Sequence, residues 1–186
     1  AAFFSNMLIG NLEESYSRLL IAPYDMKKGL LRLIDNEIAK GKNGRIIIKT
    51  NSITERDLID KLSEASCAGV QIDLIVRGIC CILPGIPEKT ENIRVTSIVG
   101  RFLEHSRIYC FGKGEARQIY ISSADIMTRN QQRRVEIAAP ILSKEHKDWF
   151  SFYLDLILMD NVKARELTSL GTYVKKGKNG RDKIGV

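Results

Sequence analysis

The sequence contains no apolar run long enough to cross a membrane. Its longest apolar stretches, such as Ile46–Ile48 and Val70–Val76, are short or interrupted by polar residues, whereas a membrane-spanning helix needs about 20 apolar residues. The first residues also lack the basic flank and apolar segment of a secretory signal. We therefore expect a cytoplasmic protein, with peripheral contact as its only association with a membrane.

Proline and cysteine are scarce. The chain has 4 prolines in 186 residues and is 44% hydrophobic and 27% charged, which excludes disordered and collagen-like architectures. The four cysteines, Cys67, Cys80, Cys81 and Cys110, form no C-x-x-C pair. This spacing excludes a zinc knuckle and a disulfide framework, and it indicates free thiols packed as small apolar groups.

Basic residues exceed acidic ones, 29 to 22, which gives a formal net charge of +7. Residues 175–183 carry five positive charges and one negative, or +4, so the first 174 residues carry +3. We expect a single domain over residues 1–174 and a flexible basic tail over residues 175–186. The charge favours a polyanionic ligand, but a core so mildly basic argues against a specific nucleic-acid partner.

Hydrophobic periodicity predicts alternating strands and helices in the first half. In chain order, these are a strand at Arg18–Ala22, a helix at Met26–Ala39, a strand at Arg45–Thr50, a helix at Thr54–Ala68 capped by Thr54, and a strand at Val70–Val76. Strands that are joined through helices form parallel sheets, which bind ligands at the carboxyl ends of their strands.

The second half is richer in strands. The pattern predicts strands at Ile93–Val99, Arg107–Phe111, Gln118–Ser122 and Val135–Ile141, followed by an amphipathic helix at Lys144–Met159. Together the two halves predict an α/β fold with a mixed, largely parallel sheet flanked by helices.

His105 and Arg107 are the first candidates for ligand contact. They lie at the start of a predicted strand, where alternation places both side chains on one face. A guanidinium binds two phosphoryl oxygens at once, and an imidazole can hold or deliver a proton near neutral pH. The pair resembles the His-x-Lys of phospholipase D-type phosphodiesterases, although Gly112 occupies the position of their following Asp.

Three more polar segments follow predicted strands. Arg77 ends the third strand, Lys49–Ser52 ends the second, and Ser122–Asn130 leaves a later one. Each segment is also explained by turn formation and helix capping. His146, in the polar start of the last predicted helix, is expected to be exposed or to cap that helix.

Several strings, in this order and spacing, resemble the C-terminal domain of the long bacterial polyphosphate kinases. They are Ile75–Cys81, Pro84–Pro87, Glu91–Val95, Ser97–Arg107, Ser122–Asp125, Arg129–Asn130 and Arg134–Glu136. The resemblance covers about residues 18–170 and implies a phospholipase D-like fold. It also implies reversible transfer of the terminal phosphate of ATP to polyphosphate through a phosphohistidine.

The resemblance assigns roles to individual residues. Arg77 matches an arginine that contacts nucleotide phosphates, and His105 matches a second catalytic histidine that assists proton transfer or stabilises the transferring phosphoryl group. The remaining candidates are phosphate or carboxylate contacts from Arg101, Arg107, Arg129 and Arg134, with support from Ser123, Asp125, Asn130 and Glu136. Asp125 and Glu136 are expected to orient arginines.

The family's phosphohistidine and its magnesium-linked arginines belong to a preceding domain, and their sequence context does not occur here. The resemblance thus implies a fragment that is inactive alone. Its expected partners are ATP or ADP with Mg²⁺, polyphosphate, the preceding domain, and further copies in a homo-oligomer. Two alternatives stay open at this point: a phospholipase D-like phosphodiesterase acting as a dimer, and a noncatalytic polyanion-binding module.

Overall fold

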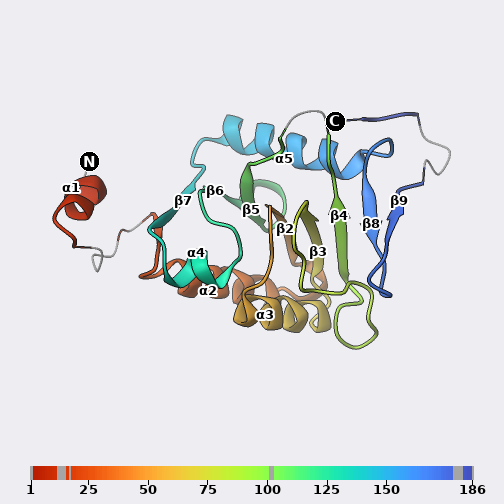
Figure 1. Ribbon diagram of the computed structural model, residues 1–186, viewed down its shortest axis with the longest axis horizontal. Helices are drawn as coiled ribbons and strands as arrows, with labels where there is room; N and C mark the ends of the chain where they lie inside the picture. Colours follow the sequence, from red (N-terminus) through yellow and green to blue (C-terminus); the bar gives the residue numbers. More distant parts are fainter. Residues whose placement is uncertain (1, 12–15, 17, 101–102, 178–181, 186) are drawn as a thin grey trace.

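The computed structural model describes residues 2–11, 16, 18–100, 103–177 and 182–185. These residues form a nine-stranded mixed sheet in the order β1-β7-β6-β5-β2-β3-β4-β8-β9. The helices α2 and α3 cover one face of the sheet and α5 covers the other (Figure 1). None of the described helices is both long enough and apolar enough to span a membrane.

The bounds of the strands are β1 Leu20–Ala22, β2 Arg45–Thr50, β3 Gln71–Val76, β4 Ile93–Ser97, β5 Arg107–Phe111, β6 Gln118–Ser122, β7 Glu136–Pro140, β8 Arg165–Leu167 and β9 Tyr173–Lys175. The helices are α1 Ala2–Leu8, α2 Met26–Ile38, α3 Arg56–Cys67, α4 Thr128–Gln132 and α5 Lys144–Met159. Short 3-10 helices lie at Gly41–Asn43 and Gly114–Ala116.

Parallel pairing is confined to the centre of the sheet. The strands β2, β3 and β4 are parallel, and the other six of the eight strand pairs are antiparallel. The expectation of a largely parallel sheet was therefore wrong, although the mixed sheet with flanking helices is confirmed. Only six residues separate β5 from β6, too few for the crossover that parallel strands require.

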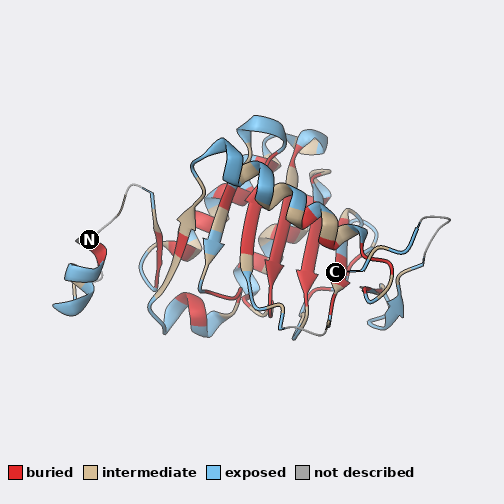
Figure 2. Ribbon diagram, turned by 90° about the horizontal axis from the view of Figure 1, so that it is seen from above, coloured by how far each residue is buried: buried red, intermediate tan, exposed pale blue. Residues whose placement is uncertain are grey.

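The apolar core lies on both faces of the central strands. Ile46 and Leu74 face α2 and α3, whereas Ile47 and Ile75 pack on the α5 side beside Ile157. Figure 2 shows these strands as the most buried part of the molecule. Strands covered on both faces are apolar almost throughout, which explains why the sequence predicted them well.

The helix α3 begins at Arg56, so the expectation that Thr54 caps it was wrong. The backbone N–H groups of Thr54 and Glu55 both donate to the carbonyl oxygen of Ile126, at 2.8 and 3.1 Å. Ile53 forms bridges to Cys80 and Ile126. These contacts keep the chain extended up to Glu55, and they join the segments that follow β2, β3 and β6.

The described part of residues 175–185 packs against the domain and differs from the expected free tail. Lys175 belongs to β9. The backbone N–H of Lys176 donates to the Ala164 carbonyl at 3.0 Å. Asn161 and Ile184 exchange hydrogen bonds, from the Asn161 N–H to the Ile184 carbonyl and from the Ile184 N–H to Asn161 Oδ1, both at 3.0 Å. The boundary expected after residue 174 therefore falls inside a strand.

Candidate functional site

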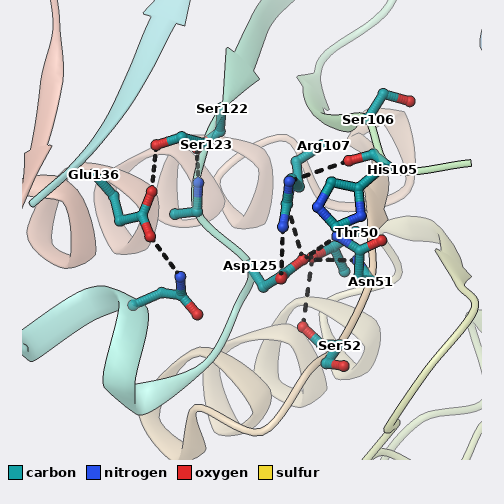
Figure 3. A network of polar contacts seen from close by, with 12 residues as sticks. Thr50, Asn51, Ser52, His105, Ser106, Arg107, Ser122, Ser123, Asp125 and Glu136 are labelled. Atoms are coloured by element: carbon teal, nitrogen blue, oxygen red, sulfur yellow. Dashed lines mark hydrogen bonds and ion pairs between the residues drawn. The ribbon is translucent and has the colours of Figure 1, made fainter. Parts of the chain in front are cut away.

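Four of the predicted site residues come together at one edge of the sheet, where β2 and β3 end: Arg77, His105, Arg107 and Asp125. Because β5 runs antiparallel to β2, with Lys49 opposite Ile108, its first residues lie beside the carboxyl end of β2. The strand β6 ends at the same edge, with Ser122 opposite Arg107. Figure 3 shows that His105, Arg107 and Asp125 lie close together there.

Arg77 contacts His105 directly. Its Nη2 atom lies 3.0 Å from His105 Nδ1, and its Nε donates to Asn51 Oδ1 at 2.6 Å. A guanidinium has no acceptor, so Nδ1 of His105 accepts this bond and the proton of the neutral imidazole is carried by Nε2. The imidazole is exposed. Arg77 therefore orients a proton-bearing nitrogen at the surface of the site.

Asp125 is the centre of the polar network and is only 8% exposed. Its Oδ1 accepts hydrogen bonds from Thr50 Oγ1 at 2.9 Å, and from the N–H and Nδ2 of Asn51 at 2.8 and 2.9 Å. Arg107 donates two more hydrogen bonds to Asp125, from Nε to Oδ1 at 3.2 Å and from Nη2 to Oδ2 at 3.1 Å. Burial by itself raises the pKa of Asp125, but the bonds from Arg107, Asn51 and Thr50 lower that pKa to about 2.

Arg107 uses its guanidinium within the chain. Besides the two bonds to Asp125, its Nη1 donates to the backbone carbonyl of His105 at 3.2 Å. The alternation argument placed Arg107 and His105 side by side toward one ligand. The structure instead turns the guanidinium onto a carboxylate, which favours the carboxylate-contact role over direct contact with a polyanion.

A second polar cluster lies next to this network. Glu136 accepts hydrogen bonds from Ser123 Oγ through Oε2 and from Asn130 Nδ2 through Oε1, the latter at 2.7 Å. Ser123 Oγ also accepts from the N–H of Ile137 at 3.1 Å. Glu136 thus orients a hydroxyl and an amide, and it forms no ion pair with an arginine among the described residues.

The structure describes two of the three remaining predicted arginines. Arg129 and Arg134 are exposed and form no ion pair within the described ranges. Arg101 lies outside the described residues. His146 is exposed in the first turn of α5, and its N–H donates to Ser143 Oγ at 3.3 Å, as expected for a residue at a helix start.

Sequence reasoning assigned no role to Lys49, which is 3% exposed and contacts the residues on both sides of His105. Its Nζ donates to Ser106 Oγ at 2.8 Å and forms an ion pair with Glu104 Oε2 at 3.4 Å. Burial lowers the pKa of Lys49, Glu104 raises it, and the charges of Arg77 and Arg107 lower it further. The available signal was a lysine directly after the apolar run Ile46–Ile48, because buried lysines are almost always paired.

The cavity at this edge is small. Lys49, Thr50, Arg77 and Glu104 line it together with Ile75, Ile98 and Ile157, and its volume is about 10 Å³. A bound nucleotide needs several hundred Å³. As formed by the described residues, this cavity is therefore too small to enclose a nucleotide.

The described residues do not fit a divalent metal site. No group of three or more His, Cys, Asp or Glu side chains among them is placed to hold an ion. The carboxylate of Asp125 is engaged by Arg107 and that of Glu104 by Lys49. Mg²⁺ prefers carboxylate oxygens that retain lone pairs for it, so no step involving Mg²⁺ is assigned to these residues.

Comparison with known proteins agrees with this arrangement. Residues 19–185 match the family described as polyphosphate kinase C-terminal domain 2. The chain is 51% identical over 177 residues to the polyphosphate kinase of Bacillus cereus, covering 93% of this chain and 25% of that protein. The solved polyphosphate kinase of Porphyromonas gingivalis matches with a TM-score of 0.92 and 40% identity, over 98% of this chain and 29% of that one.

A more distant likeness concerns the fold alone. The phospholipase D family member Nuc from Salmonella typhimurium is 13% identical, with a TM-score of 0.61, over 82% of this chain and 97% of that one. The expected phospholipase D-like fold is confirmed. The chain spans about a quarter of the length of the Bacillus cereus protein. Over residues 19–185 it belongs to the polyphosphate kinase family, as the C-terminal domain 2 of such enzymes.

Proposed function

We propose that this chain supplies part of the active site of an enzyme that reversibly transfers the terminal phosphate of ATP to polyphosphate. The observation that carries the proposal is the Arg77–His105 contact, a guanidinium and an imidazole 3.0 Å apart at the carboxyl edge of the sheet. The rest of the site, including a phosphohistidine and the groups that bind Mg²⁺, is assigned to a preceding domain. The full-length enzyme is proposed to act as a homo-oligomer.

Arg77 is assigned to the phosphates of ATP or ADP. Phosphoryl transfer depends mainly on positioning and on neutralising the charge of the transferring group. Asn51 fixes Nε of Arg77, and His105 contacts Nη2. The guanidinium therefore meets its ligand already oriented, which reduces the entropy lost on binding.

His105 is assigned to the transferring group. With Nδ1 facing Arg77, the other ring nitrogen, Nε2, is able to donate a hydrogen bond to a phosphoryl oxygen or to move a proton to or from it. Arg107 holds the backbone carbonyl of His105. The pair Asp125–Arg107 thus supports the site and does not take part in the reaction.

The isolated chain is expected to make no polyphosphate, because covalent transfer needs the nucleophilic histidine that we assign to the preceding domain. After incubation with labelled ATP and Mg²⁺, the chain should carry no acid-labile phosphate and yield no polymer. The same chain within the full-length enzyme should be active. Stable phosphorylation of His105 in the isolated chain would contradict the division of the site between two domains.

Polyphosphate binding by this chain is expected to depend on the exposed Arg129 and Arg134 more than on the basic C-terminal segment. A double variant, Arg129→Ala/Arg134→Ala, should bind polyphosphate about tenfold more weakly, since exposed ionic contacts contribute up to about 1 kcal/mol each and about 1.4 kcal/mol corresponds to a tenfold change in affinity. The comparison variant, Lys178→Gln/Arg181→Gln/Lys183→Gln, removes three charges and leaves Lys175 and Lys176 in place.

Titrations at two salt concentrations separate these contributions. Binding through Arg129 and Arg134 should weaken less between about 0.05 and 0.2 M salt than binding through the five positive charges of residues 175–183, because the salt dependence grows with the number of phosphates contacted. A large loss in the C-terminal variant with no loss in the arginine variant would assign polyphosphate binding to the C-terminal segment. That result would also favour the reading of this chain as a general polyanion-binding module.

A further inference from the structure

The buried ammonium group of Lys49 contacts the residues on both sides of His105. Its Nζ donates to Ser106 Oγ at 2.8 Å and to the Ser106 carbonyl at 3.3 Å, and it lies 3.5 Å from the Glu104 carbonyl. It also forms the ion pair with Glu104 Oε2 at 3.4 Å. The three N–H donors of one side chain therefore hold the backbone immediately before and after the imidazole.

Part of the surroundings of Lys49 is apolar. Ile75, Ile98 and Ile157 line the same small cavity, and Ile47, two residues earlier in β2, packs into the core cluster that contains all three. An apolar side chain would fill this position without the cost of burying a charge, which is several kcal/mol for an unpaired ion. The stability of the core therefore does not explain a lysine here, whereas contact with the His105 segment does.

The ion pair of Lys49 extends to α5, which covers the same face of the sheet. Glu104 Oε2 also accepts a hydrogen bond from the hydroxyl of Tyr153 in α5 at 3.0 Å. The His105 segment is thus tied to β2 through Lys49 and to α5 through Tyr153. The charged groups that face Lys49 are Glu104, Arg77 and Arg107. Arg77 contacts Nδ1 of His105, and Arg107 contacts the backbone carbonyl of His105.

We propose that Lys49 is a positioning residue for His105, which fixes the segment Glu104–Ser106 so that Arg77 and the imidazole stay in contact. The inference rests on the function proposed for His105 above. Lys49 is buried and its ammonium group is engaged by Ser106 and Glu104, so we assign it no contact with phosphate. It affects the reaction only by fixing the position of the His105 imidazole.

The test uses the full-length enzyme that contains this chain. Lys49→Met keeps the length of the side chain and removes its charge and donors. A displacement of a reacting group by about 1 Å costs on the order of 10²-fold in rate, so kcat should fall by roughly 10- to 100-fold. The KM for ATP should change less, because Arg77 keeps its bond to Asn51. Lys28→Met, at an exposed lysine in α2, is the control and should behave as wild type.

A double variant separates positioning from a general loss of stability. Lys49→Met leaves Glu104 buried in part without its cation, whereas Lys49→Met/Glu104→Gln removes both charges and keeps the hydrogen bond to Tyr153 possible. This double variant should fold, with a melting temperature near that of wild type, and should still lose turnover. Failure of the double variant to fold would make Lys49 a residue of the fold and overturn the proposal.

Combination with His105→Ala provides the decisive measurement. If Lys49 acts through His105, Lys49→Met lowers kcat in the wild-type background and has little further effect in the His105→Ala background. Independent, additive losses would overturn the proposal. Normal turnover of His105→Ala would instead refute the function proposed for His105, so the two failures are distinguishable.

Discussion

His105→Ala in the full-length enzyme is expected to lower kcat by about 10²–10⁴-fold, with a much smaller change in the KM for ATP. A positioned proton donor or acceptor contributes a factor of this size, and it does so mainly in the transition state. The exposed imidazole with Nδ1 facing Arg77 is the geometric basis. Steady-state rates of polyphosphate synthesis at saturating and limiting ATP separate the two constants.

Arg77→Ala should behave differently and lower both kcat and the affinity for ATP. A guanidinium that holds ground-state phosphates contributes to binding as well as to the transition state, and its loss also removes the partner of His105 Nδ1. His146→Ala is the matched histidine control, because His146 lies at the start of α5 beside Ser143. Turnover of His105→Ala close to that of wild type would return His105 to a structural role.

The strands that could be predicted from the sequence are those in which hydrophobic burial dominates the choice of residues. Buried strands such as Arg45–Thr50 and Arg107–Phe111 have the predicted bounds, since continuous apolar residues at a length of five or six are typical of strands. Pairing direction was harder to predict. It depends on connections such as the short turn between β5 and β6 and on the pairing of β1 with β7, residues more than one hundred positions apart.

The short elements near the C-terminus escaped prediction for a related reason. The strands β8 and β9 have three residues each, too few for a hydrophobic period to be seen. Their stability comes from pairing: β8 pairs with β4, where Thr96 lies opposite Glu166, and β9 pairs with β8. The pairing of β9 with β8, where Lys175 lies opposite Arg165, makes Lys175 part of a strand, although its neighbours in sequence suggested a charged segment in solvent.

The site was predictable in its location and less so in its contacts. Arg77 follows β3 and His105 precedes β5, and the two meet at one edge because β5 runs antiparallel to β2. The direction of a long side chain depends on distant partners. Arg107 turns to Asp125, which lies 18 residues later in the chain and carries three further hydrogen bonds from β2 and the residue that follows it.

The largest effect on stability is expected at this Asp125–Arg107 pair. Asp125→Ala should lower the free energy of unfolding at pH 7 by about 3–5 kcal/mol, because it leaves a nearly buried guanidinium and the donors of Thr50 and Asn51 without their acceptor. Chemical denaturation measures this change. Asp148→Ala is the control: its exposed carboxylate pairs with Arg117 and Lys144, and such pairs contribute at most about 1 kcal/mol.

The stabilisation by Asp125 should also depend on pH, with a defined sign. Its pKa in the folded chain is about 2, below the ordinary value of 3.8, so the folded state favours the charged form. The contribution of Asp125 to the free energy of unfolding is complete above about pH 4. It decreases by about 2 kcal/mol as the pH falls toward 2. Other carboxylates are shared by the wild type and Asp125→Ala and largely cancel in their difference. That difference in unfolding free energy should therefore shrink between pH 5 and pH 2, and a difference that stays constant over this range would show that the charge of Asp125 does not hold Arg107.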